Sequence, residues 1–156
     1  MEAKRVSDSI TEQVQIVMNE QINGYGRLFG GRLVEWIDIV AGVVARRHSN
    51  CNITTVAIDN LHFKEAARVN QTVVLNGRIT YVGKTSMEVR VDTFVEALSG
   101  KKTLVNRAYL VMVALDENER PTPVPPLLLE TEEEKLEWEA GEKRSALRKQ
   151  RKREQF

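Results

Sequence analysis

The segment "NGYGRLFGGRLVEWIDIVAG", residues 23–42, places four of the chain's nine glycines within residues 23–31, directly ahead of a helical apolar pattern. From residue 33 onward, apolar side chains recur at i, i+3, i+4 and i+7, and further apolar residues widen the stripe until only Glu35 and Arg46 are plainly solvent-facing. A helix that is apolar almost all round must be wrapped by other elements, and the rest of the chain supplies only strands. We therefore expect one central helix enclosed by a sheet.

The strands are predicted from runs of alternating or continuous apolar residues. An entering strand is expected at 10–18 and another at 53–63, with its period slipping at Asp59–Asn60, which indicates a bulge or bend. Three more are expected at 72–82, 87–97 and 103–116, and the short connections between them favour an antiparallel meander. In the segment 103–116, both odd- and even-numbered positions beyond Ala108 are apolar, as in a strand that is covered on both faces.

Length and composition favour one domain over residues 1–129 and a charged, partly helical tail over residues 130–156. The net charge of +1 gives no reason to expect nucleic acid or a membrane as partner. No apolar window is long enough to span a bilayer and the first residues lack a signal-peptide core, so a cytoplasmic location is expected. Cys51, His48 and His62 are too isolated to indicate a metal site.

The tail carries 8 acidic and 8 basic residues, with most of the acids in residues 130–139 and most of the basic residues in residues 143–153. It is either an interaction arm for RNA or another subunit, or a solvated segment whose Leu136, Trp138 and Leu147 touch the body. Charge blocks of this length favour the second interpretation.

The glycine run does not fit known phosphate loops. Phe29 stands where a dinucleotide fingerprint needs glycine, and Arg32 and Leu33 stand where a Walker A loop needs lysine and serine or threonine. Glycines at a helix start also leave N–H groups open to an oxyanion or a carbonyl oxygen. The alternative is that they only permit a tight turn.

Asp38 is the one acid among the apolar residues of this helix, two turns after Gly31. A carboxylate there is costly unless it has a partner, and it is suited to general-base chemistry. The alternative is an internal pair with no catalytic role.

The series Asn23-x-x-Gly26-x-x-Phe29-Gly30-Gly31, followed by Trp36-Ile37-Asp38 and "TTVAIDNLHF" at 54–63, resembles the acyl-coenzyme A thioester hydrolases of the hotdog fold. The resemblance is to the branch with the bacterial short-chain and mammalian brain-type enzymes, and it spans residues 6–127. It implies an α+β hotdog fold, with an antiparallel sheet wrapped around one long central helix.

The resemblance also implies hydrolysis of acyl-CoA to a free fatty acid and coenzyme A in a site shared by two subunits. Asp38 would act as general base or nucleophile, Asn23 of the facing subunit would orient the water, and N–H groups near Gly30 and Gly31 would bind the oxyanion. A homodimer is implied, with further assembly into a trimer of dimers. No metal and no cofactor is expected, since coenzyme A is part of the substrate.

By the same resemblance, the pantetheine arm would lie along one strand and the phosphates near one turn. The strand residues are Thr55, Val56, Ala57 and Ile58, and the turn residues are Gly83, Lys84, Thr85 and Ser86, with Lys101 and Lys102 as competing phosphate contacts.

Three alternatives remain open. A non-catalytic acyl-CoA sensor on the same fold is disfavoured because Asp38 and Asn23 are both present, and an interaction protein would act through the tail. A hydratase would need a histidine at the helix start. Arg107 is predicted to contact either a coenzyme phosphate or Asp92 on the neighbouring strand.

Overall fold

The computed structural model describes residues 1–59 and 61–156, which form seven strands and two long helices. The strands are β1 (Lys4–Arg5), β2 (Thr11–Ile16), β3 (Asn52–Asp59), β4 (Thr72–Val82), β5 (Ser86–Glu96), β6 (Lys102–Leu115) and β7 (Leu127–Leu128); the helices are α1 (Gly30–Ser49) and α2 (Glu132–Glu154), and 3₁₀ turns lie at Val6–Asp8 and Asn19–Gln21. The predicted helix and all five predicted long strands are present.

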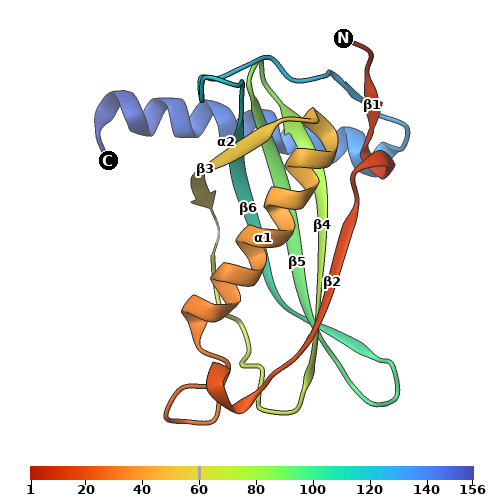
Figure 1. Ribbon diagram of the computed structural model, residues 1–156, viewed down its shortest axis with the longest axis vertical. Coiled ribbons are helices and arrows are strands. Elements are labelled where there is room, and N and C mark those ends of the chain that lie inside the picture. Colours follow the sequence, from red (N-terminus) through yellow and green to blue (C-terminus); the bar gives the residue numbers. More distant parts are fainter. Residues whose placement is uncertain (60) are drawn as a thin grey trace.

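Five strands form one antiparallel sheet in the order β2-β4-β5-β6-β3. The predicted meander of β4, β5 and β6 is confirmed. In Figure 1 the sheet curls around α1, which crosses one of its faces. The strands β2 and β3 are the two edges, so each leaves one row of backbone groups unpaired within a single chain.

Helix α1 buries one broad stripe in the sheet. Ile37, Ala41 and Val44 have no accessible surface, and Gly77 of β4 lets the helix approach closely, because a side-chain carbon there would lie 2.7 Å from Val40 Cγ1. The opposite stripe is not covered: Ile39 is 49% exposed. The expectation of burial on almost every side is therefore wrong for one chain, since the sheet reaches only one side of the helix.

The edge strand β3 is irregular at Val56, where its pairing with β6 shifts by one residue. The predicted irregularity lay at Asp59–Asn60, and Asn60 is outside the described residues. The strand ends at Asp59 rather than continuing to residue 63.

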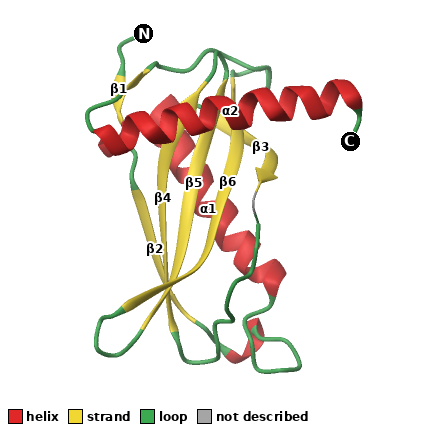
Figure 2. Cartoon of the chain, turned by 180° about the vertical axis from the view of Figure 1, so that it is seen from behind, coloured by secondary structure: helices red, strands yellow, loops and turns green. Residues whose placement is uncertain are grey.

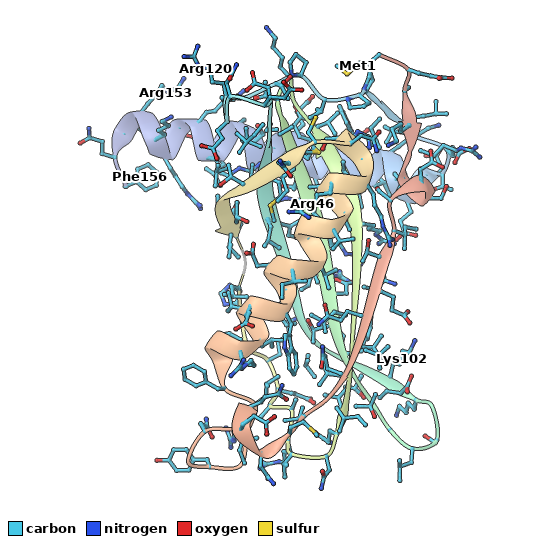
Figure 3. All side chains as sticks on the ribbon, in the orientation of Figure 1. Met1, Arg46, Lys102, Arg120, Arg153 and Phe156 are labelled. Carbon is cyan, nitrogen blue, oxygen red and sulfur yellow. The ribbon has the colours of Figure 1, made fainter. Side chains whose placement is uncertain are left out.

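The tail forms helix α2, which lies across the face of the sheet opposite to α1 (Figure 2). Trp138 packs against Tyr81 of β4 with the rings tilted and their centroids 4.4 Å apart, whereas Leu136 and Leu147 are exposed. The helix continues past the β3 edge, so that Arg153 and Phe156 lie beyond the sheet (Figure 3).

Helix α2 covers the face of the sheet that carries the alternating polar residues of β5. Glu88 is 1% exposed, and Arg144 of α2 donates to its two carboxylate oxygens at 2.9 and 2.8 Å. Thr80 donates to the same carboxylate at 2.7 Å, and the Arg144 guanidinium lies 3.7 Å from the centre of the Tyr109 ring. The bare backbone of Gly141 allows this approach, since a side-chain carbon there would lie 2.9 Å from Glu88 Oε1.

A second ion-pair cluster lies beside the first. Arg107 donates to Asp92 at 2.7 Å, which confirms the cross-strand alternative predicted for Arg107, and Arg90 joins Asp92 to Glu137 of α2. Burial raises the pKa of Asp92, but hydrogen bonds from Arg90 and Arg107 outweigh it and hold that pKa below its ordinary value.

The two ends of the folded body meet at the carboxyl end of α1. Strand β1 pairs in parallel with β7, and the Lys4 ammonium donates to the carbonyl oxygens of Arg47 and His48 in the last turn of the helix. The Nε2 atom of His48 lies 2.8 Å from the carbonyl oxygen of Pro125, which it contacts as a donor. The two Lys4 contacts satisfy carbonyls that the end of α1 otherwise leaves unpaired.

Candidate functional site

The amino end of α1 follows the glycine-rich loop and has an unusual start. Gly26 has a φ of +72°, so glycine is needed there for the turn, whereas Gly30 and Gly31 have ordinary helical backbone. The tight-turn explanation therefore applies to Gly26 and not to the glycine pair. No side chain among the described residues caps the helix start at Phe29, and the first N–H groups of a helix have no partner within it. The backbone there is available to an acceptor from outside the helix.

Asn23 lies at the start of the same loop with its amide group held in one orientation. Its side-chain oxygen accepts hydrogen bonds from the backbone N–H groups of Tyr25 at 2.9 Å and Arg27 at 3.3 Å. This leaves the amide nitrogen, which carries two donors, without an acceptor among the described residues.

A cavity of about 580 Å³ opens beside this loop, between the start of α1, the segment at 63–68 and the lower ends of β4, β5 and β6. Asn23 and Gly30 form one part of its wall. Its apolar lining comes from Leu28, Leu33, Phe63, Ala67, Val73 and Val105. Its charged lining comes from the exposed residues Arg27, Lys64, Glu65 and Arg68.

Asp38 is half-buried on the flank of α1 that faces β3. Its Oδ1 atom accepts a hydrogen bond of 2.7 Å from the Thr55 hydroxyl, whose oxygen also lies 3.2 Å from the sulfur of Met112. In the part of the chain that the structure describes, the carboxylate thus has one hydrogen-bonding neighbour, and its remaining lone pairs can accept a proton or further hydrogen bonds.

Within one chain, the predicted catalytic residues form two separate groups. Gly30 and Asp38 are eight residues apart on α1, which at the helical rise separates them by about 12 Å along the axis. A reacting carbonyl must lie within about 3 Å of both its oxyanion donors and its nucleophile. The structure brings Asn23 together with Gly30, and Asp38 together with Thr55.

The turn Gly83–Ser86 joins β4 to β5 at the end of the sheet away from the glycine-rich loop (Figure 1). Lys84 is exposed, and its carbonyl oxygen accepts from Val124 N–H at 2.9 Å. Within one chain this turn is not close to the cavity. Lys101, the last residue of the β5–β6 turn, and Lys102, the first residue of β6, lie at the cavity's end of the sheet (Figure 1). The contact of the Gly83–Ser86 turn with coenzyme phosphates stays a prediction.

The described residues contain no cluster of three or more histidine, cysteine, aspartate or glutamate side chains suited to a metal ion. In the same residues, neither long helix is apolar enough over its length to cross a lipid bilayer. His48 is buried at the end of α1 away from the cavity. The backbone carbonyl oxygen of His62 accepts a hydrogen bond from Asn106 Nδ2.

The sequence analysis missed the interior of the cavity. Thr93 of β5 lines it and has no accessible surface. The signal was present in the alternation of this strand, where Met87, Val89 and Val91 point inward and Thr93 follows at the same parity.

Comparisons with known proteins place these observations in a family. A family model described as the thioesterase superfamily matches residues 25–98. An uncharacterized acyl-CoA thioester hydrolase, YkhA of Bacillus subtilis, is 38% identical over 84% of this chain and 77% of its own length. The cytosolic acyl coenzyme A thioester hydrolase of Rattus norvegicus is 33% identical over 92% of this chain, which spans only 38% of that longer protein.

Solved structures agree in fold. The crystal structure of an apo-hexameric acyl-CoA thioesterase has a TM-score of 0.92 and 38% identity, with 97% of each chain covered. An acyl-CoA hydrolase from Staphylococcus aureus, in complex with butyryl coenzyme A, coenzyme A and coenzyme A disulfide, has a TM-score of 0.92 and 28% identity, covering 98% of this chain and 94% of its own. Further structures of the Staphylococcus aureus hydrolase carry alanine in place of an aspartate, a threonine or an asparagine.

Proposed function

This chain belongs to the hotdog-fold acyl-CoA thioester hydrolases of the thioesterase superfamily, and from that premise we propose that it hydrolyses acyl-CoA thioesters to a free acid and coenzyme A. The observation that carries the proposal is the Asp38 carboxylate, which Thr55 holds at 2.7 Å beside the open edge strand β3. A thioester whose carbonyl reaches this edge meets a carboxylate with free lone pairs.

Asp38 acts either as general base on a water molecule or as nucleophile on the thioester carbonyl. In the first route, a proton moves from water to Asp38 as the hydroxide forms the new bond to carbon, and it later leaves on the coenzyme A sulfur. In the second, the carboxylate forms a mixed anhydride with release of the thiolate, and water then hydrolyses the anhydride. Thr55 orients the carboxylate in both routes.

The oxyanion that develops on the carbonyl oxygen is assigned to the uncapped start of α1. Backbone N–H groups near Gly30 and Gly31 point outward from the helix end, and a donor of this kind is typically worth about 3 kcal/mol to the transition state. The free amide nitrogen of Asn23 adds a donor for the attacking water or for the carbonyl oxygen. Glycine keeps this approach free of side chains.

The separation of about 12 Å along α1 supports a site whose groups come from two chains. We assign Asp38 and Thr55 to one subunit and Asn23, Gly30 and Gly31 to the facing one, in a homodimer that packs through the uncovered side of α1 and the β3 edge. Apolar side chains exposed there support this surface, among them Ile39 at 49% and Val56 at 55%. Assembly into a trimer of dimers is part of the proposal, and one structural relative is hexameric.

The spacing of three replaced residues in the Staphylococcus aureus hydrolase supports the same assignment. Along that chain the asparagine precedes the aspartate by 15 positions and the threonine follows it by 17. These are also the spacings from Asn23 to Asp38 and from Asp38 to Thr55. The strand from Thr55 to Ile58 and the turn from Gly83 to Ser86 remain our proposed contacts for pantetheine and phosphate.

The experiment is a thiol-release assay on acyl-CoAs of increasing chain length with wild type, Asp38→Asn, Asn23→Ala and the control Glu35→Gln. Glu35 is an exposed acid on the same helix. We expect Asp38→Asn to lose at least about a hundredfold in kcat, as general-base removal does, and Glu35→Gln to stay near wild type. Full turnover in Asp38→Asn would refute the mechanism, and binding without turnover by wild type would favour a sensor.

A mixing experiment tests the shared site. Asp38→Asn and Asn23→Ala chains, each inactive alone, are co-refolded in equal amounts. Half of the dimers are then mixed, and each mixed dimer keeps one intact site of two, so about a quarter of wild-type activity returns in a symmetric dimer. No recovery, with mixed dimers shown by mass spectrometry, would place all the groups in one chain.

A further inference from the structure

The cavity beside the start of α1 continues inward from the proposed carbonyl site. Asn23 and Gly30 form part of its wall, and buried apolar side chains of Leu33, Val73 and Val105 line the part beyond them. A chain attached to a carbonyl held at Gly30 therefore lies next to the apolar inner part of a cavity whose whole volume is about 580 Å³.

The charged residues that line the cavity do not enter this interior. Arg27, Lys64, Glu65 and Arg68 are all exposed, so their head groups remain in water at the open side. The lining thus changes from charged at the surface to apolar inside, as expected for a pocket that receives an apolar chain and leaves the anionic part of its carrier outside.

One polar group interrupts the apolar interior. Thr93 has no accessible surface, lines the cavity, and its hydroxyl has no hydrogen-bond partner in the part of the chain that the structure describes. Asn106 stands opposite to it in the β5–β6 register; its side-chain nitrogen donates to the His62 carbonyl, but its oxygen is also buried without a partner among the described residues. Buried polar groups normally have partners, so an unpaired hydroxyl in a cavity wall is a position for a ligand's polar group.

We propose that this cavity binds the acyl chain and that Thr93 is a specificity-determining residue, whose hydroxyl favours chains with a hydrogen-bonding oxygen substituent, such as a hydroxyl, over saturated chains. The inference rests on the proposed thioester hydrolysis and specifies its substrate class. A threonine hydroxyl both donates and accepts, so it pairs with either a hydroxyl or a keto oxygen. A saturated chain leaves it unpaired and loses that contribution.

The first test compares kcat/KM for butanoyl-, hexanoyl- and octanoyl-CoA with their 3-hydroxy counterparts. For at least one chain length, we expect wild type to favour the hydroxylated substrate by about three- to tenfold, the range of one neutral hydrogen bond. Thr93→Val keeps the shape and removes the hydroxyl, so the ratio should fall to near one. Thr93→Ser should keep the preference, and the control Val91→Leu, on the same strand but outside the cavity lining, should leave the ratio as in wild type.

A ratio that is the same in wild type and Thr93→Val, or near one in wild type at every chain length, overturns the assignment of Thr93. Thermal unfolding gives a readout that does not depend on turnover. Since Thr93→Val removes an unpaired buried hydroxyl, its melting temperature should equal or exceed that of wild type, and a clear decrease would show that the hydroxyl is already paired. Absence of hydrolysis of every thioester would instead contradict the proposed function.

The second test fills the cavity from its open side. Ala66 is exposed and lines the cavity, so Ala66→Phe adds bulk there without disturbing the buried core. The ratio of kcat/KM for octanoyl- to butanoyl-CoA should fall by about fourfold for each methylene that no longer fits. The control Ala97→Phe changes an exposed alanine in the β5–β6 turn, outside the cavity, and should leave the ratio unchanged. An equal ratio in Ala66→Phe and wild type would place the acyl chain elsewhere.

Discussion

Replacing Arg144 by alanine should loosen α2 from the sheet and destabilise the protein by about 3 kcal/mol. Arg144 donates two hydrogen bonds to the Glu88 carboxylate, and its guanidinium stacks on Tyr109. Hydrogen bonds to a charged group contribute about 1.5 kcal/mol each, and the cation–π contact about 0.5 kcal/mol. The arginine regains rotamer entropy when undocked, which offsets about 0.5 kcal/mol, and Glu88 keeps its bond from Thr80.

The measurement is urea unfolding at fixed protein concentration, with thermal unfolding as a second probe. For a chain of this size, 3 kcal/mol lowers the melting temperature by about 9 °C. The matched control is Arg153→Ala, which changes an exposed arginine at the free end of the same helix, where it makes no ion pair with a described residue (Figure 3). We expect a change of less than about 0.5 kcal/mol there.

Adding Glu88→Gln to Arg144→Ala separates the ion pair from simple loss of contact area. Because Glu88 is 1% exposed, the single variant leaves its charge with only the more distant Arg148, 3.4 Å from Oε2, and the Thr80 hydroxyl. The double variant should therefore be more stable than the sum of the two single changes predicts. Equal effects of Arg144→Ala and Arg153→Ala would refute the reasoning, since they would mean that Glu88 is hydrated and α2 is not docked in solution.

Two further predictions concern α1. Burial lowers the pKa of His48 below its ordinary 6.5 and outweighs the hydrogen bond to Pro125, so the folded protein disfavours the protonated imidazole. The free energy of unfolding should therefore decrease progressively as the pH falls below about 6.5, because the unfolded chain binds the proton more readily. His48→Gln should make the free energy of unfolding less dependent on pH between about pH 7.5 and 5.5. An unchanged slope would contradict this. Gly77→Ala would place its new carbon 2.7 Å from Val40 and should cost about 2 kcal/mol by urea unfolding, whereas a neutral result would show that the helix can shift away.

The central helix and the meander were predictable because their signals are local. The period of β4 fixed its bounds at Thr72–Val82, and the apolar repeat after Gly31 marked α1. The exposure of Ile39 was not predictable, because apolar residues on a helix are the same in sequence whether the chain itself or a second copy covers them.

The environment of the outer sheet face depends on contacts far apart in sequence. Arg144 and Glu88 are 56 positions apart, and the alternating charges of β5 and the charge blocks of α2 each resemble a solvated surface when read alone. Their burial follows only from the docking of one on the other, with Trp138 on Tyr81 as its apolar anchor.

The candidate site shows the same limit. The resemblance pointed to Asn23, Asp38 and the glycine pair, but the bond from Thr55 to Asp38 depends on the register of β3 around Val56. The role of Thr93 could be suspected only from a polar residue at an inward position, and its unpaired hydroxyl requires the cavity to be seen.

The two ends of α1 should differ in their motion. Lys4 holds the carbonyls of the last turn and His48 is tied to Pro125. In contrast, no side chain of the described residues caps the first turn, which is held only through the backbone bond from Phe29 N–H to the carbonyl oxygen of Gln21 at 2.8 Å. In hydrogen–deuterium exchange, amides of the last turn should open together with β1 and β7, and those of the first turn should open separately and sooner. The last turn of the helix is thus tied more firmly than the first, and small displacements of the first turn would change the position of the proposed oxyanion donors without moving Asp38 by as much.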